Sequence, residues 1–326
     1  MGWSDYVLKR AAFTVVTIFV AISLNFLLFR VLPGTAVSSL ARVPNATIQL
    51  KRHLTTEFGL NLSLRTQYLD YLRQLFRGNL GISFANQQPV TSNLAEALFN
   101  TLPVVTVATV LSLVLGIATG VLSAWRRGTV LDQLSTNSAI VLYALPTQWI
   151  ALLLLIAFAR YLPTAGTDSP FAVVAPPFWQ HLGDVIEHMV LPATTLVLTL
   201  YGGNTLIVRS ALLETLGEDY MLTARAKGIG RGKMMWAHAL RNAMLPTITV
   251  LAQDVGLLIG GIVAVETIFA YPGIGRLLVY ALERHDLPLM QAAILIMTAI
   301  QCLANLAADL LYCVFNPKIR YGRALN

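Results

Sequence analysis

Six long apolar runs constrain this chain more than any other feature of its sequence. They occupy residues 11–31, 101–124, 136–159, 189–211, 245–268 and 289–314. Each is close to the roughly 20 apolar residues that a helix needs to cross the hydrocarbon core of a bilayer. Because that core offers no water to unpaired backbone groups, a run of this kind is expected to be helical. The sequence therefore predicts an all-α integral membrane protein with six transmembrane helices.

The composition agrees with a membrane protein. Hydrophobic residues make up 56% of the chain and charged residues only 12%, whereas a soluble domain carries about 25% charged residues. The formal net charge of +7 is explained by cytoplasmic loops, which collect Lys and Arg, and does not require nucleic acid as a partner. The two cysteines, Cys302 and Cys313, lie too far apart along one helix to form a disulfide.

Prolines support the boundaries of the runs. Seven of the fourteen prolines follow a leucine, and six of these seven are expected at span edges, where a missing N–H costs little. Pro146 is the exception and predicts a kink in the third span. The first run follows Lys9 and Arg10, as a signal peptide would. It is longer than the roughly 7–15 apolar residues of a signal peptide and lacks a cleavage site, so a retained span is expected.

Basic residues predict the orientation. They gather in four groups that six spans would place on one side: Lys9 and Arg10; Arg126 and Arg127; Arg225, Lys227, Arg231, Lys233 and Arg241; and Lys318, Arg320 and Arg323. That side should be the cytoplasm, which gives cytoplasmic segments 1–10, 212–244 and 315–326. Residues 32–100 then form a long extracytoplasmic loop. Within it, Leu64, Tyr68, Leu72 and Leu75 follow one helical stripe, which predicts an amphipathic helix in an outer cap or at the interface.

No catalytic constellation is present. The five histidines are scattered, and the sequence contains no HExxH, GxSxG or paired-cysteine motif, so no catalytic residue, metal site or cofactor is expected in this chain. The segment from Gly228 to Lys233 resembles a P-loop only superficially. Three residues separate its outer glycines and Met234 follows the lysine, whereas a P-loop needs four residues and a hydroxyl that binds magnesium. This chain should not hydrolyse ATP by itself.

Polar residues inside the apolar runs are candidates for a translocation path. Asp254 interrupts the fifth run, and Gln301, Asn305 and Asp309 recur every fourth residue in the sixth. A carboxylate in the membrane is costly and is a functional candidate by default. These residues either line the path or a proton relay, or form structural hydrogen bonds between helices. The spacings Gly116–Gly120 and Gly256–Gly260 would permit close helix contact, although GxxxG is common by chance.

The loop 212–244 combines basic residues with small ones in helical order. Tyr220, Ala224 and Gly228 fall on one stripe, with Thr223 and Lys227 on its neighbour. Small residues let another surface approach a helix closely, and the flanking cations can reach its rim. An ordinary positively charged cytoplasmic loop would explain the charges but not the ordered small residues, so a docking surface is the favoured interpretation.

The same loop resembles a known family. Thr223-Ala-Arg-Ala-Lys-Gly228 followed by His238-Ala-Leu-Arg-Asn-Ala-Met-Leu-Pro246 is similar to the "EAA" loop of binding-protein-dependent ABC importer permeases, in its dipeptide/oligopeptide/nickel form. Further segments in family order are Arg30–Gly34, Phe58–Leu60, Arg77–Phe84, Val265–Phe269, Tyr271–Arg276, Asp309–Tyr312 and Asn316–Tyr321. Arg30 and the long outer loop favour the B-type subunit. The chain departs from the pattern in lacking the EAA glutamate and in having Thr35 where the branch often has an acid.

The resemblance implies a type I ABC importer permease fold in a bacterial inner membrane. It implies a second six-helix permease, one or two P-loop ATPase subunits that carry ATP and Mg, and an extracytoplasmic binding protein. The coupling helix would involve Tyr220, Thr223, Ala224, Arg225, Ala226, Lys227 and Gly228. Oligopeptides or dipeptides are the expected substrates, with nickel chelates, glutathione and opines left open. A proton-coupled secondary transporter using Asp254 and Asp309 is the alternative, and no nucleic acid is expected as a partner.

Overall fold

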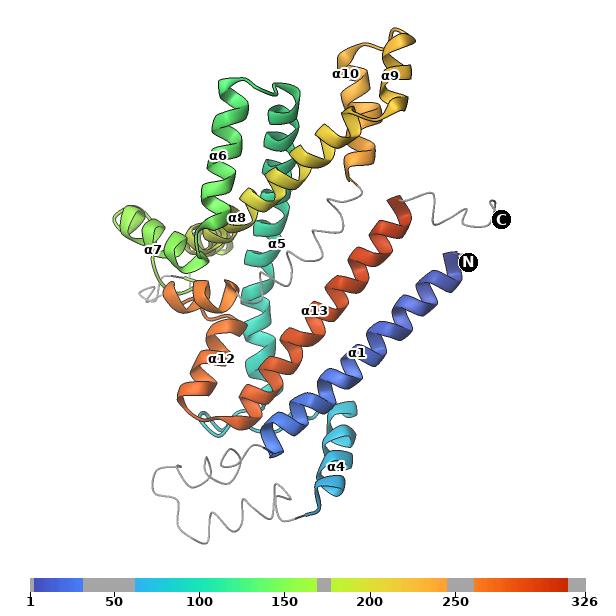
Figure 1. The fold of residues 1–326 in the computed structure, drawn as a ribbon. Helices are drawn as coiled ribbons and strands as arrows, with labels where there is room; N and C mark the ends of the chain where they lie inside the picture. Colours follow the sequence, from blue (N-terminus) through green and yellow to red (C-terminus); the bar gives the residue numbers. More distant parts are fainter. Residues whose placement is uncertain (1–2, 32–61, 169–176, 245–260, 316–326) are drawn as a thin grey trace. The chain divides into compact units, whose positions relative to one another are not determined.

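The computed structural model describes residues 3–31, 62–168, 177–244 and 261–315. Its elements are α1 (Trp3–Val31), α4 (Leu64–Phe76), α5 (Val90–Trp125), α6 (Val130–Ala144), α7 (Thr147–Phe158), α8 (Phe178–Leu216), α9 (Asp219–Ala226), α10 (Arg231–Lys233), the π-helix η1 (Met234–Ala239), α12 (Ile274–Glu283) and α13 (Leu287–Phe315) (Figure 1). Across these ranges the only extended pairing is an isolated bridge between Ile82 and Pro89. The predicted all-helical class is confirmed for the described part of the chain.

Four of the described helices are long and apolar enough to cross a membrane: Asp5–Arg30, Val90–Trp125, Phe178–Leu216 and Leu287–Leu311. The pair α6 and α7 passes the same test when it is counted as one broken span. Most of the expected fifth span, 245–268, lies outside the described residues. The multi-pass architecture is therefore established, and the count of six spans stays a prediction.

Two helices extend well beyond the spans expected within them. The helix α5 begins at Val90 and contains Pro103 in its interior, and α8 begins at Phe178 and contains Pro192. The expectation that these prolines mark helix ends was wrong. Hydropathy indicates where a helix leaves the hydrocarbon core of the membrane. The helix itself can continue beyond that point, as long as the local sequence tolerates helical hydrogen bonding. Neighbouring elements and local adjustments can satisfy the backbone group that a proline frees.

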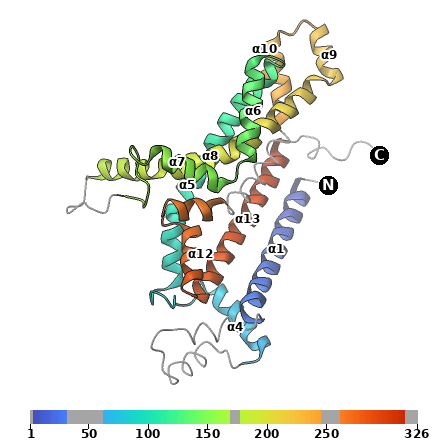
Figure 2. The ribbon, with the colours of Figure 1, turned by 60° about the vertical axis from the view of Figure 1, so that its left-hand side comes forward.

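The kink expected at Pro146 is confirmed, and it is a complete break. The helix α6 ends at Ala144, Leu145 is extended with φ −77° and ψ 130°, and Pro146 precedes the first residue of α7. A residue before proline is pushed out of the α region, which ends the helix at this point. The axes of α6 and α7 differ by 105°, and Figure 2 shows α7 turning away from α6.

The described chain divides into two compact units. The first comprises residues 1–12, 102–271 and 303–326, and the second comprises 13–101 and 272–302. Each has its own packing.

Glycines allow three helices of the first unit to approach closely. A Cβ at Gly120 of α5 would lie 2.8 Å from the Cβ of Val208 on α8, and one at Gly116 would lie 2.5 Å from the Cβ of Asn204. At Gly202 of α8 a Cβ would overlap the carbonyl oxygen of Ala139 on α6. The expected role of the Gly116–Gly120 pair in helix contact is confirmed. The other pair, Gly256–Gly260, lies outside the described residues.

An ion pair between a partly exposed arginine and a buried aspartate joins α6 and α8 in the same unit. The Arg209 guanidinium donates from Nε to Oδ1 of Asp132 at 2.8 Å and from Nη2 to Oδ2 at 3.0 Å. Asp132 is 4% exposed, and its carboxylate also accepts from the Ser123 hydroxyl and from the Gly128 N–H. These contacts fix the turn between α5 and α6 against α8. Sequence analysis did not single out either member of this pair.

The second unit is organised around a buried acid. Asp286 is fully buried and accepts hydrogen bonds from the Ser83 hydroxyl and from the backbone N–H groups of Ala85 and Leu289. It thereby attaches the segment after α4 to the start of α13.

The amphipathic helix expected within 64–76 is confirmed as α4. Its Tyr68 and Tyr71 rings pack against Phe26 of α1, with centroids 5.1 and 5.5 Å away. Leu64, expected on the same packed stripe, is 53% exposed. The inward face of α4 is therefore built on its two tyrosines.

Candidate coupling site

The loop expected to contact a partner begins where α8 ends. The backbone N–H of Gly217 caps α8 by donating to the carbonyls of Glu214 and Thr215. Glu218 is extended, and α9 begins at Asp219, so the chain reverses into a second helix within two residues. Figure 1 shows α9 and α10 beside each other at the end of α8.

This loop has its own hydrophobic core. Met221, the one fully buried residue of α9, is 1% exposed. The buried residues of the core are Val121 and Ala124 of α5, Val208, Ala211 and Leu212 of α8, Met221 of α9, and Met234, Met235, Ala239 and Ala243. Because residues from five segments share one core, the loop is a folded extension of α5 and α8 rather than a loose connection.

The end of α9 is set by glycine. Gly228 has φ +74°, a conformation that costs little only without a Cβ. Its N–H donates to the carbonyl of Arg225 at 2.9 Å, and the N–H of Ile229 donates to that of Ala224 at 3.2 Å. These two bonds form a Schellman cap, and its accompanying apolar contact is supplied by Ala224 and Ile229, which both pack on the loop core.

The outward face of α9 combines apolar, small and basic side chains. Leu222, Thr223, Arg225, Ala226 and Lys227 are all exposed. Together they form a short continuous surface of mixed apolar and cationic character, to which Gly228 adds the exposed end.

Two of the small residues expected to contact a partner have roles within this chain that already explain their small size. Ala224 is half-buried and faces the loop core, and Gly228 is required by its backbone conformation. Open space surrounds the Cβ position of Gly228 within this chain. Their contact with a partner subunit stays a prediction.

Tyr220 joins the two ends of the loop. Its hydroxyl accepts a hydrogen bond of 2.7 Å from Nδ2 of Asn242. This bond ties α9 to the helical residues 240–244 that follow η1. The ring is 42% exposed, so Tyr220 can serve as an internal tie and still present an edge to a partner.

The expected path residues fall in two places. Asp254 lies outside the described residues. Gln301, Asn305 and Asp309 follow one another along α13, and Oδ2 of Asp309 forms an ion pair of 3.0 Å with Nη1 of Arg10 on α1. The two side chains are 34% and 43% exposed. This pair favours the structural interpretation of Asp309, and roles for all four residues in transport stay predictions.

Apolar helices of membrane-spanning length, together with a folded loop carried on the end of one of them, define a multi-pass membrane protein. Residues 112–321 match the family model of the binding-protein-dependent transport system inner membrane component. This match covers the glycine contacts, the loop and α13. The chain belongs to that family and is a permease component of a binding-protein-dependent transport system.

Similarity to individual relatives covers nearly the whole chain. The chain is 34% identical to the dipeptide transport system permease protein DppB of Escherichia coli K12, over 98% of this chain and 99% of the relative. It is 35% identical to the probable peptide ABC transporter permease protein y4tP of Sinorhizobium fredii, over 97% and 99%. The glutathione transport system permease protein GsiC of E. coli K12 is 34% identical over 97% and 99%. The resemblance expected from the motifs is confirmed.

Proposed function

We propose that this chain is one of two permease subunits of an ATP-driven importer and that α9 binds a separate ATPase subunit. The observation that carries the proposal is the outward face of α9, which is held in place by the core of the loop. A helix that transmits force between subunits must be rigid relative to the helices it moves. The shared core, the Schellman cap and the bond between Tyr220 and Asn242 supply that rigidity.

The proposed topology places six spans in a bacterial cell membrane, with both termini and the α9 loop in the cytoplasm. The basic groups support this orientation, because Arg225 and Lys227 lie on α9 or its cap and Lys9 and Arg10 precede the first run. In this topology an extracytoplasmic binding protein meets the segment between α1 and α5. A second six-helix permease completes the path.

The proposed substrates are short peptides. Two relatives of near-complete coverage are named for dipeptide or peptide transport and a third for glutathione, which is itself a tripeptide. The ion pair between Arg10 and Asp309 supports a structural role for Asp309 rather than a role in a proton relay.

Bulky substitutions on α9 test the coupling proposal. Thr223→Trp and Ala226→Trp change exposed positions, so folding and membrane insertion should persist while uptake falls by about tenfold or more, as expected when one hot-spot contact is lost. Glu214→Trp, at an exposed position on α8 before the loop, is the matched control and should transport normally. Normal uptake by both α9 variants, at wild-type expression, would exclude this docking surface.

The substrate requires a separate measurement. Thermal-shift titration of the partner binding protein with dipeptides, glutathione and nickel chelates should give the largest shift with a peptide. A shift with a nickel chelate alone would reject the peptide assignment and leave the coupling proposal intact.

A further inference from the structure

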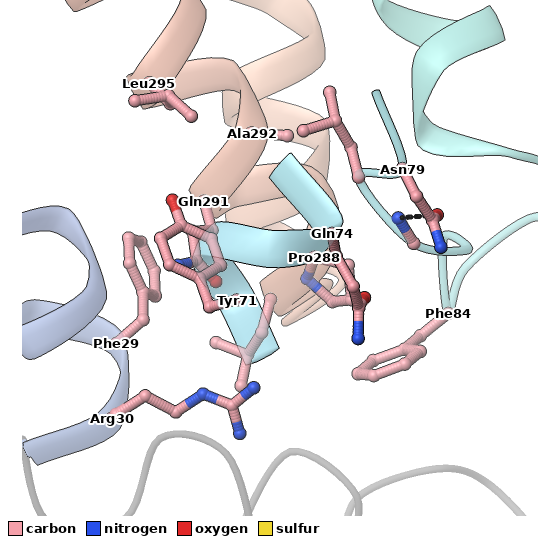
Figure 3. Close-up of a pocket in the computed structure, with 13 residues that line it drawn as sticks. Phe29, Arg30, Tyr71, Gln74, Asn79, Phe84, Pro288, Gln291, Ala292 and Leu295 are labelled. Carbon is pink, nitrogen blue, oxygen red and sulfur yellow. Dashed lines mark hydrogen bonds between the residues drawn. The ribbon is translucent and has the colours of Figure 1, made fainter. Parts of the chain in front are cut away.

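The second unit contains a cavity of about 120 Å³ at the end of α1. Residues from the end of α1, from α4, from the segment 79–84 and from the start of α13 line it. Figure 3 shows Arg30 extending from α1 toward the residues of α4, with Tyr71 and Gln291 also lining the cavity. Neither the coupling site nor the expected path residues belong to this cavity.

The polar groups of the cavity include three prominent donors. Arg30 forms no hydrogen bond or ion pair with another described residue. The Tyr71 hydroxyl and Nε2 of Gln291 are buried and interact with each other, but neither forms a hydrogen bond of good geometry within the described ranges. Burial raises the pKa of Tyr71, so its hydroxyl stays protonated and able to donate. Buried donors without acceptors are costly.

No acidic residue lines the cavity. A guanidinium with two neutral donors and no carboxylate favours an anion, and arginine binds carboxylate and phosphate especially well. The remaining walls are largely apolar and include Phe29, Phe84 and Leu295. The ligand should therefore carry an anionic group next to an apolar body and should not need a binding site for an ammonium group.

The position of the cavity relative to the membrane indicates which kind of anion it binds. Arg30 is the last residue of the candidate span Asp5–Arg30, and Leu287, which lines the cavity, is the first residue of the candidate span Leu287–Leu311. The cavity thus lies where two spans end, at the level of lipid headgroups. On α1, Val20, Leu24, Leu27 and Leu28 form an exposed apolar stripe that leads to this end of the helix.

We propose that this cavity binds the phosphate of an anionic phospholipid through Arg30, Tyr71 and Gln291. The acyl chains would lie along the exposed stripe of α1. Because the lining offers no acid for an ammonium group, phosphatidylglycerol should be preferred over phosphatidylcholine. The bound lipid would supply acceptors to these three side chains and would join α1, α4 and α13 at the membrane surface.

Native mass spectrometry of the purified full-length chain tests this site. Titration with phosphatidylglycerol and phosphatidylcholine should show the former bound more tightly. Arg30→Gln should weaken phosphatidylglycerol binding about tenfold, as expected for the loss of one charge-assisted contact. Tyr71→Phe, which removes one hydroxyl, should weaken it less. Arg77→Gln changes an exposed arginine just after α4 that does not line the cavity and should bind like the wild type.

Three results would overturn the proposal. The first is equal phosphatidylglycerol binding by the Arg30 and Arg77 variants, with both folded by circular dichroism. The second is no preference of the wild type for phosphatidylglycerol over phosphatidylcholine. The third is displacement of the lipid by trialanine in the wild type with loss of trialanine binding in Arg30→Gln, which would assign the cavity to a substrate carboxylate.

Discussion

Arg209 of α8 binds both carboxylate oxygens of Asp132 at the start of α6, across a separation of 77 residues. The carboxylate is almost fully buried, and Ser123 and Gly128 supply further donors to it. Arg209 lies seven residues, about two helical turns, before the end of α8, from which the folded loop continues. The pair therefore holds α8 in place next to the point where the loop begins.

Removing one member of this pair should destabilise the protein strongly. Arg209→Ala leaves a buried carboxylate without its counter-ion, a change that costs about 3–5 kcal/mol in other proteins. Thermal unfolding in detergent should show a large decrease in the stability of this variant. The matched control is Arg10→Ala, which breaks the more exposed pair with Asp309 and should cost about 0–1 kcal/mol. Equal losses in the two variants would show that the Arg209 pair contributes no more than a surface pair.

The glycine contact between α6 and α8 should not tolerate a methyl group. Gly202→Ala would place its Cβ against the backbone carbonyl of Ala139, and overpacking of this kind costs about 1–3 kcal/mol. Gly183→Ala in the same helix meets nothing within 4 Å and should be neutral or stabilising, because alanine favours a helix. Thermal unfolding of the two variants gives the comparison. A stable Gly202→Ala variant would mean that the two helices can separate at little cost.

The backbone conformation at the cap of α9 predicts that substitutions of Gly228 reduce transport to different degrees. Its φ of +74° should make Gly228→Val more harmful than Gly228→Asn, because asparagine tolerates the left-handed region and a β-branched residue does not. Uptake normalised to membrane expression measures the effect. Gly230→Ala, at a position with open space and no positive φ, is the control. Equal activity of the Asn and Val variants would contradict a conformational role and favour a purely steric one.

Tyr271 predicts a loss of stability at alkaline pH. Burial, together with the charge of Glu266, raises its pKa to about 12, whereas an unperturbed tyrosine titrates near about 10. Between these values the unfolded state releases the proton and the folded state retains it, so stability falls as pH rises. Unfolding between pH 9 and pH 12, as roughly bounded by these two values, should show a smaller decline in Tyr271→Phe than in the wild type. Parallel curves would exclude this contribution.

Sequence reasoning located the features that depend on local chemistry. Pro146 predicted the interruption between α6 and α7 because proline restricts its predecessor wherever it occurs. The helical spacing of apolar residues within 64–76 predicted α4, because such spacing is a local property of the sequence. Hydropathy did not predict helix length, since α5 and α8 continue through Pro103 and Pro192.

Other features depend on contacts that no local pattern contains. The Arg209–Asp132 pair requires knowledge that α6 and α8 are neighbours, which neither residue's surroundings reveal. The stripe through Ala224 was visible in the sequence, but helical period alone does not say which face of a helix is inward. Only the packing of Ala224 on the loop core resolves this point.

The missing side chains at Gly116, Gly120 and Gly202 act as an interlock. Backbone and side-chain atoms of one helix occupy the space where the next helix lacks a Cβ, so α5, α6 and α8 cannot turn about their own axes without first moving apart. If a partner subunit binds α9 as proposed, a force applied there would move these three helices together as one rigid block rather than shift one helix past another.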